Sequence, residues 1–554
     1  MSLMEKKPDL ILINGDFRTQ DEKTPYARSV AVSGSGHLAG RILAVGSTND
    51  VMRLQSSGTK VIDLENRLVL PGFTDAHFHL HDWALARKHL DFSETASLDD
   101  LKKQIRERAD SVAPDYWIKG FRFNETQWPE NRYPTKTDLD EAAPIHPVVI
   151  WRMDLHMVVV NTMAMTLAGV DEKTPDPDDG VIQKDHTGRL TGVFKENAMD
   201  LIISAIPENT DEEIYESIKE GIEELHTYGL TGIHDIRISD GKEGGNALRA
   251  FKRLNSKGLL KLRLWVTHHG LRIDEAVDWG LRTGHGDGRL FNGHLKYFAD
   301  GSMGARTAWM MEPYTDAEYG MPVMDMDILY KHIALADKSG LSVMIHAIGD
   351  RANREIISLF EKLYKSRGVA SKISFDKPRH RIEHLQLVRP EDINRLKNLP
   401  ICVCMHPHNS VLDINMIDSC AGENAKFAYT FKEVINAGIP LMLSSDAPVC
   451  DPRPLKGIHA AVTRRREDGF PEKGWYPDQR LTVDEAVKGY TKTPAYASDV
   501  QDKMGTITPG KFADIIVLDT NIYECDPMDI HKTGVYMTVF DGEIVFTVDR
   551  NHMC

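Results

Sequence analysis

Short apolar runs separated by glycine turns mark both ends of the chain. Near the N-terminus, the segments 9–14, 27–36 and 40–47 are rich in aliphatic residues and are broken by glycines. Near the C-terminus, 505–519 and 535–548 have the same pattern, and Asp541-Gly542 is a typical hairpin turn. Because both ends predict strands, we expect one small composite β-sandwich built from residues 1–68 and 505–554.

The middle of the chain alternates apolar strands with amphipathic stretches such as residues 211–229. This alternation predicts an α/β fold, a (β/α)8 TIM barrel over residues 69–504. The expected strands read LVLPGFTDAHFH, GLTGIHDI, LKLRLWVTHH, HLKYFADG, LSVMIHAI, RHRIEHLQ, ICVCMHP and PLMLSSDAP.

One connection in the predicted barrel is too long for a loop. About 140 residues separate the first expected strand from GLTGIHDI, whereas connections within such units are usually short. The intervening chain has strand signals of its own, in WIKGFRFNETQW and PVVIWRMDLHMVVVN. We therefore expect an inserted subdomain over residues 82–225.

Composition and charge narrow the classes of molecule that this protein is expected to bind. The formal net charge of −15 disfavours binding to nucleic acid or to an anionic membrane surface. We expect no membrane-spanning segment and no signal peptide. Cys402 and Cys404 face one side of an apolar strand and are interpreted as small packed residues, not as a metal or redox pair. The expectation is a cytoplasmic enzyme acting on a small molecule, and we also allow for a homodimer.

A His-x-His pair ends the first expected barrel strand. His77 and His79 are two residues apart, so on a strand their imidazoles face the same side and can hold one metal ion. The competing interpretation is a packed strand with two incidental histidines. Three further ligand-type residues favour the metal, because His346, His384 and Asp446 each follow an apolar strand. Barrel enzymes carry their active sites at the carboxyl-terminal ends of the strands. Imidazole and carboxylate ligands together suit Zn²⁺.

Lys296 lies inside the apolar strand HLKYFADG. A buried lysine is costly unless it is paired or modified. It could form a buried ion pair or extend its amine to solvent. Alternatively, the amine could react with CO2 to give a carbamate, an anionic group able to bridge two metal ions.

Several motifs together resemble the amidohydrolase superfamily, and the long insertion with two of them resembles its YtcJ-like (amidohydrolase 3) branch, which includes N-substituted formamide deformylase relatives. The motifs are PGFTDAHFH, LKYFADGSMGARTA, MIHAIGDRAN, RIEHLQ, LSSDAP and PGKFADIIVLD. The resemblance implies a site with one or two divalent ions, Zn²⁺ in the first instance. It implies one ion on His77, His79 and Asp446, a second on His346 and His384, and a bridging carbamate on Lys296.

Two residues of the insertion are further catalytic candidates. His156 lies in RMDLHMVVVN and could reach the substrate or its leaving group. Glu196 lies in TGVFKENA and could support the site or approach the metal. The alternative for each is a local cap or hydrogen bond within the insertion.

Four residues near the ends of the barrel strands have less specific expectations. Asp300 and Arg306 follow the Lys296 strand and could contact substrate or hold the loop. His406 and His408 follow the seventh strand. They could line the pocket, but we expect them to support it or to serve packing.

The ligand set and the resemblance together favour hydrolysis of a C–N bond, in an amide or an N-acyl or N-formyl compound, by a metal-activated water. The resemblance implies Asp446 as the general base. A deaminase, with a single metal and no bridging lysine, remains an alternative. An esterase, lactonase or phosphotriesterase on the same scaffold is another. A non-catalytic binding module is disfavoured, because such proteins typically lose ligands.

Overall fold

The computed structural model describes residues 7–34, 36–93, 95–125, 128–152, 157–177, 180–236, 242–366 and 379–548. The chain divides into two compact units. One comprises Met1–Trp83 with Ile218–Cys554, and the other comprises Ala84–Ser217. Among the described helices, none combines the length and apolarity needed to cross a lipid bilayer.

Eight parallel strands of the first unit form one sheet, in the order β21-β20-β19-β18-β17-β16-β15-β8. Every strand pairs with its neighbour in sequence, as the predicted barrel requires. The strands are β8 (Phe73–Phe78), β15 (Leu230–Asp235), β16 (Arg263–His269), β17 (Leu290–Phe298), β18 (Val343–Ala347), β19 (His380–His384), β20 (Ile401–Met405) and β21 (Leu441–Leu443). The (β/α)8 prediction is confirmed, and each of the eight expected segments contains a strand of the sheet.

The first and last strands come together at their carboxyl ends. The backbone N–H of Asp446 donates to the carbonyl of His77 at 3.0 Å, and the N–H of His79 donates to the carbonyl of Ala447 at 2.9 Å. These bonds close the sheet just beyond β21. Residues separated by more than 360 positions in sequence therefore become neighbours at one rim of the barrel.

Helices surround the barrel because their apolar residues recur at helical spacing. In α11 (Asp350–Ser366), for example, Ile356, Phe360 and Leu363 are buried at intervals of four and three residues. Two helices, α2 (Leu80–Ala86) and α7 (Asp211–Thr227), cross the boundary between the units. The other helices of the first unit outside the sandwich are α8 (Lys242–Ser256), α9 (Ile273–Asp278), α10 (Met326–Lys338), α12 (Pro390–Leu396), α13 (Pro407–Leu412), α14 (Ile414–Ala421), α15 (Phe431–Asn436), α16 (Pro454–Thr463), α17 (Val483–Tyr490) and α18 (Lys492–Ala497).

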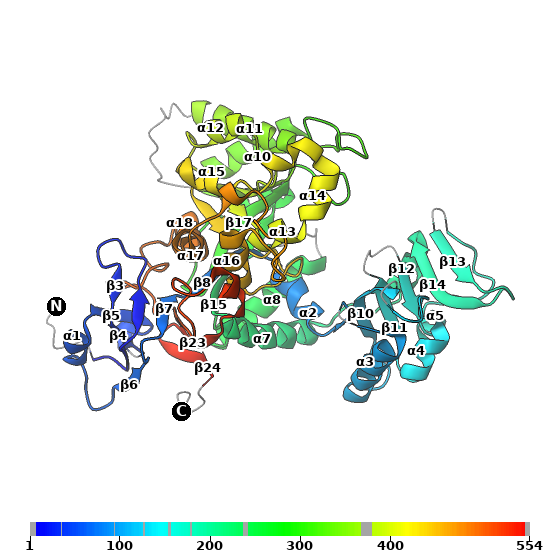
Figure 1. The fold of residues 1–554 in the computed structure, drawn as a ribbon, viewed down its shortest axis with the longest axis horizontal. Coiled ribbons are helices and arrows are strands. Elements are labelled where there is room, and N and C mark those ends of the chain that lie inside the picture. The colour runs from blue at the N-terminus through cyan, green and yellow to red at the C-terminus, as the bar shows by residue number, and fades with distance from the viewer. Residues whose placement is uncertain are drawn as a thin grey trace. The chain divides into compact units, whose positions relative to one another are not determined.

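The two ends of the chain together form the two sheets of the sandwich. In Figure 1 the blue N-terminal strands and the red C-terminal strands meet around β7. One sheet has the order β5-β4-β1-β6 and the other β24-β23-β22-β7-β2-β3. The strands of the two sheets are β1 (Leu10–Ile13), β2 (Asp16–Arg18), β3 (Tyr26–Ala27), β4 (Ser29–Ser33), β5 (Arg41–Gly46), β6 (Lys60–Asp63), β7 (Leu68–Pro71), β22 (Ile515–Leu518), β23 (Val535–Phe540) and β24 (Glu543–Thr547). Leu12, Val69 and Val517 pack in one core, so residues from both termini bury the same apolar cluster.

The segment LVLPGFTDAHFH does not form one barrel strand as expected. It divides at Gly72 into β7, which pairs with β22 in the sandwich, and β8, which pairs with β15 in the barrel. A side chain at Gly72 would overlap Thr231, so the chain passes between the two sheets at the residue that allows this close approach.

The second unit has a sheet of its own, in the order β13-β14-β12-β11-β10-β9. Its strands are β9 (Leu90–Asp91), β10 (Ile118–Phe123), β11 (Val148–Arg152), β12 (Met157–Val160), β13 (Gly180–Lys184) and β14 (Leu190–Glu196), and its helices are α3 (Leu98–Ser111), α4 (Lys136–Ala142), α5 (Thr162–Leu167) and α6 (Asp200–Ile203). Successive residues alternate between two apolar clusters: Val148 and Ile150 face one, Val149 the other. Both faces are covered, which explains the uninterrupted apolar runs in this segment.

A buried charge cluster joins the barrel to the sandwich. The Arg263 side chain on β16 is fully buried and donates to Asp514 at 2.9 Å and to Asp541 at 3.1 Å. Its guanidinium also lies 3.5 Å from the centroid of the Phe512 ring. Asp514 and Phe512 belong to the C-terminal segment that leads into the sandwich, so this arginine holds that segment against the barrel.

Replacing Asp514 by alanine should therefore destabilise the protein. The change leaves the Arg263 charge buried with only Asp541 beside it, and we expect a loss of about 3 kcal/mol in urea denaturation. The control is Asp529→Ala, which breaks the exposed Lys532–Asp529 pair and should change stability by less than about 0.5 kcal/mol. Equal stability of the two variants would contradict the structural role of Arg263.

Candidate metal centre

The ends of β8 and β21 bring together the first predicted ligand group. The ligand atoms of His77, His79 and Asp446 all lie within 4.8 Å of one another, and all three side chains are buried. Asp446 Oδ1 is 3.2 Å from His79 Nε2 and 3.5 Å from His77 Nε2. Sequence spacing predicted the pair His77 and His79, and closure of the barrel adds Asp446 to it.

The Nδ1 atoms of His77 and His79 form hydrogen bonds within the protein. His77 Nδ1 is 2.6 Å from Glu383 Oε2, and His79 Nδ1 is 3.0 Å from the carbonyl of Ile236. Because both of these oxygens only accept, each Nδ1 carries a proton, and in the neutral ring each Nε2 has a lone pair. Two lone pairs and a carboxylate oxygen thus face one another in a buried space. Such an arrangement requires a proton or a cation, so these residues fit a metal ion.

His346 and His384 lie beside this group. The His346 Nε2–H donates to the carbonyl of Gly301 at 2.9 Å, which leaves Nδ1 as the ligand atom. The rings of His346 and His384 have their centroids 4.3 Å apart, and the rings of His384 and His77 are 5.2 Å apart. The structure therefore brings the four predicted histidines into one cluster.

Two of the predicted ligands have a left-handed backbone. The φ angle is +69° at His384 and +60° at Asp446. This conformation is unfavourable for residues with a β-carbon and is found mainly where function maintains it. Regular strand alternation would point Glu383 and His384 to opposite sides, yet both contact His77. The turn at His384 makes this possible.

Lys296 is 2% exposed, and among the described residues its amine has no hydrogen-bond or ion-pair partner. The Nζ atom lies 4.7 Å from the centroid of the Phe298 ring. Burial lowers the pKa of Lys296 to about 8, although the charges of Glu383 and Asp446 oppose the shift. The ion pair considered from the sequence is therefore not formed within the described part of the chain. A buried amine that is partly neutral fits reaction with CO2.

An ionic network beneath His77 was missed in the sequence. Arg381 Nε donates to Glu383 Oε1 at 2.8 Å, and Glu383 in turn accepts from His77. Arg381 Nη1 also donates to His234 Nδ1 at 2.6 Å, and His234 Nε2 then donates to Ser498 Oγ at 3.0 Å. The available signal was the pair of charged residues two apart within the expected strand RHRIEHLQ, because this spacing places both on one face of the strand.

Electrostatics favour the metal-binding protonation states. Burial lowers the pKa of His77 and His384 well below the usual histidine value, and it lowers that of His346 to about 3. Burial alone would raise the pKa of Asp446, but the hydrogen bond with His79 and the positive charges of His406, His79 and Lys296 together outweigh burial and lower the pKa. At neutral pH these rings have lone pairs available and the carboxylate is charged, as metal coordination requires.

Asp300 and Arg306 hold the loop after β17. The Asp300 carboxylate is buried and accepts backbone N–H groups of Trp309 at 2.8 Å, Ile348 at 3.0 Å and Gly349 at 2.8 Å. Arg306 pairs with Asp316 at 2.8 Å. Of the two functions considered for these residues, the loop contacts are the ones that the structure displays.

The remaining candidates occupy different places. His406 is buried beside His77 and His384, whereas His408 Nε2 lies 3.6 Å from Glu467. Glu196 ends β14 of the second unit, with an exposed side chain and a φ of +49°. His156 lies outside the described residues.

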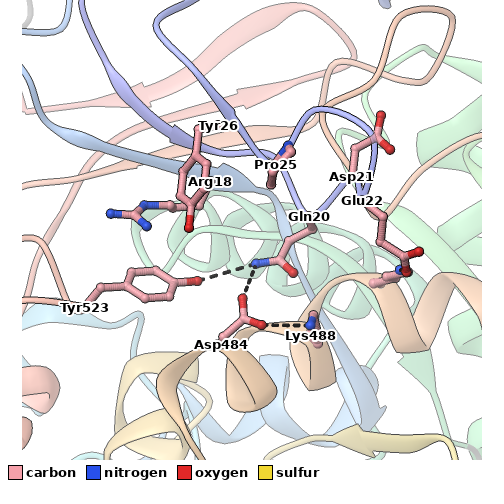
Figure 2. A pocket seen from close by; sticks show the side chains of 10 residues that line it. Arg18, Gln20, Asp21, Glu22, Pro25, Tyr26, Asp484, Lys488 and Tyr523 are labelled. Carbon is pink, nitrogen blue, oxygen red and sulfur yellow. Dashed lines mark hydrogen bonds and ion pairs between the residues drawn. The ribbon is translucent and has the colours of Figure 1, made fainter.

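A separate polar pocket lies between the sandwich and α17, and none of the candidate ligands lines it (Figure 2). Gln20 Nε2 is 3.2 Å from Asp484 and 3.4 Å from the Tyr523 hydroxyl, and Asp484 pairs with Lys488 at 2.7 Å. Its lining residues are Arg18, Gln20, Asp21, Glu22, Pro25, Tyr26, Asp484, Lys488, Lys492 and Tyr523. These charges largely neutralise one another, so the pocket has no arrangement comparable to the histidine cluster.

Comparison with known proteins agrees with the fold. The amidohydrolase family model matches residues 60–546. The chain is 33% identical to the amidohydrolase YtcJ of Bacillus subtilis, over 89% of this chain and 91% of that protein. It is 27% identical to an N-substituted formamide deformylase of Arthrobacter pascens, over 97% of this chain and 98% of that protein. A solved structure of a metal-dependent hydrolase from Pyrococcus horikoshii superposes with a TM-score of 0.74 at 27% identity, covering 94% of this chain and 99% of that one.

A parallel barrel with histidine and carboxylate side chains gathered at the carboxyl ends of its strands defines the class of metal-dependent barrel hydrolases. Within that class, the chain belongs to the amidohydrolase family. It is accordingly a metal-dependent hydrolase that acts on carbon–nitrogen bonds.

The hydrogen bond from His77 to Glu383 should control metal retention. Replacing Glu383 by glutamine removes the carboxylate that orients the ring, and we expect metal affinity to fall by about 10- to 100-fold in chelator competition. The control is Asp337→Asn, because Asp337 pairs with His380 of the same strand at 3.2 Å and neither residue belongs to the ligand groups. If folded Glu383→Gln, verified by circular dichroism, keeps the affinity of the parent protein, the orienting role is wrong.

Proposed function

We propose that the barrel rim holds two divalent ions, of which zinc fits the ligands best, and hydrolyses amide or N-acyl bonds. His77, His79 and Asp446 would bind one ion, and His346 and His384 the other. The observation that carries this assignment is the convergence of His77 Nε2, His79 Nε2 and the Asp446 carboxylate in a buried space, where either a proton or a cation must lie between them. Imidazole and carboxylate together are ligands that zinc prefers.

Lys296 would supply the bridge. Its neutral Nζ would attack the carbon of CO2, so that the N–C bond forms as one C=O π bond breaks and its electron pair moves to oxygen. The nitrogen then releases one proton to water, and the product is a carbamate with one negative charge. Burial favours the neutral amine that this reaction needs. The negative product would also compensate for the positive charge of the two ions.

The ions, when bound, supply Lewis acidity that activates a water molecule and polarises a carbonyl oxygen. Asp446 is placed to move the proton. Its carboxylate is ionised, buried and turned toward the ligand cluster by its left-handed backbone. It would take a proton from the attacking water and deliver it to the leaving nitrogen as the C–N bond breaks. Glu383 and Arg381 keep the His77 ring fixed during these steps.

The substrate class we favour is a secondary amide of N-formyl or N-acyl type. Support comes from the similarity to an N-substituted formamide deformylase over nearly the full length of both chains. A deaminase would be distinguished by one ion and no modified lysine. An esterase or lactonase would be distinguished by a preference for esters of the same acyl group.

A panel of N-formyl amines, N-acyl amines and matched esters tests the function. We expect hydrolysis of the amides, loss of activity on chelation and recovery with Zn²⁺. Asp446→Asn should lower kcat/KM by about 10³-fold or more while the protein stays folded. The control is Asp499→Asn, which removes a partner of Arg379 remote from the ligands and should leave kcat/KM unchanged. Near-normal activity of Asp446→Asn would exclude the proton-transfer role.

Carboxylation of Lys296 should be visible directly. Protein loaded with Zn²⁺ and ¹³C-bicarbonate should show a carbamate carbon signal by NMR, and Lys296→Met should lose both this signal and about one bound ion. Lys261→Met is the control, because Lys261 pairs with Glu543 at a partly exposed site. If the parent protein binds two ions without any carbamate signal, the bridging role of Lys296 is wrong.

A further inference from the structure

His406 shares the burial of the predicted ligands but was not among them. It directly follows β20 and is 1% exposed. Its ring centroid lies 5.0 Å from that of His77 and 4.5 Å from that of His384, with interplanar angles of 85° and 60°. The ligand atoms of these three histidines all lie within 4.8 Å of one another. His77, His384 and His406 therefore form a further group of converging donors beside the one made by His77, His79 and Asp446.

The two nitrogens of His406 differ in the same way as those of the predicted ligands. Nδ1 lies 2.8 Å from the hydroxyl of Ser444, whereas Nε2 is buried and has no hydrogen-bond partner among the described residues. His77 and His79 likewise have one nitrogen hydrogen-bonded within the protein and the other facing the ligand cluster. An unpaired buried polar atom costs about 1–3 kcal/mol, so it is retained where something else satisfies it.

The anchor of His406 is tied to the rest of the site. Ser444 lies two residues before Asp446, and its backbone N–H donates to the carbonyl of Met405 at 3.2 Å. Pro407 follows His406 as the first residue of α13, which restricts the backbone on the other side. Both the ring and its backbone are thus positioned before any ligand binds.

The imidazole nitrogens of this group are only slightly farther apart than in a zinc site. Imidazole nitrogens that share a tetrahedral zinc ion at about 2.0–2.1 Å lie about 3.3 Å apart. The donor atoms of His77, His384 and His406 lie within 4.8 Å of one another, so they need to approach by at most about 1.5 Å, which rotation of the imidazoles can provide.

We propose that His406 is a further metal ligand, which binds through Nε2 and shares an ion with His384 or His77. The inference rests on the proposed two-ion function and adds an imidazole from β20 to it. The site then takes ligands from β8, β17, β18, β19, β20 and the end of β21. An additional neutral ligand strengthens binding of that ion without adding charge.

The test is metal binding rather than turnover. The parent protein and His406→Ala are loaded with Co²⁺, and affinity is measured by chelator competition alongside the visible absorption spectrum. We expect His406→Ala to bind one ion at least tenfold more weakly and to show a changed d–d band. Addition of free imidazole should partly restore the parent spectrum, because the truncated side chain leaves room for it.

His408→Ala is the matched control. His408 is also a buried histidine with an unpaired nitrogen, but it is directed to Glu467 and belongs to none of the ligand groups. Its removal should leave both affinity and spectrum unchanged. His406→Gln serves as the second variant if the alanine form does not fold, and the same weakening is expected.

The outcomes separate the two proposals. A parent protein that binds no Co²⁺ or Zn²⁺ refutes the metal-dependent function itself. A parent protein that binds two ions, with variants at His406 that keep its affinity and spectrum, overturns the ligand role alone. Loss of activity with unchanged metal binding also overturns it, since His406 would then act on the substrate.

Discussion

Two backbone hydrogen bonds join the ends of β8 and β21, from Asp446 to His77 and from His79 to Ala447. They are formed by the same residues whose side chains make the first ligand group. A parallel barrel has all its carboxyl ends on one rim, and closure determines which two strands complete the circle. The ligand group consequently depends on closure, because His77 and Asp446 come from opposite ends of the barrel sequence.

The ionic network under His77 places charge where a barrel usually carries apolar side chains. Arg381 and Glu383 are fully buried, and removing two charges from water costs several kcal/mol per ion unless they are well paired. Here the pair is bidentate, and its remaining donors and acceptors contact His77, His234 and the carbonyl of Ala76. The network thus exchanges some stability for a fixed orientation of one imidazole.

Backbone geometry at the rim serves the same end. His384 and Asp446 adopt the left-handed conformation, and each has a ligand atom in the cluster. For His384, which ends β19, regular strand alternation would direct the side chain away from the side on which Glu383 lies. His406 reaches the cluster by another route, through a hydroxyl anchor and a following proline. Strain, hydrogen bonds and chain stiffness all act here to hold donors before a metal is present.

Local pattern was sufficient for much of this molecule. Aliphatic strands and amphipathic helices are set by the nearest residues, so all eight barrel strands could be predicted, as could the ligand-type residues at their ends. The chain's own pattern did not predict that LVLPGFTDAHFH divides at Gly72, because the division depends on the approach of Thr231 from a distant strand.

By itself, the sequence determined the barrel and the identity of its candidate ligands, since burial periodicity and residue chemistry are local properties. Only the tertiary structure decided that Glu383 supports His77, that Lys296 is left without an ion pair among the described residues, and that His406 joins the cluster. These relations depend on closure and on turns at single residues, which bring together side chains that no spacing along the chain connects.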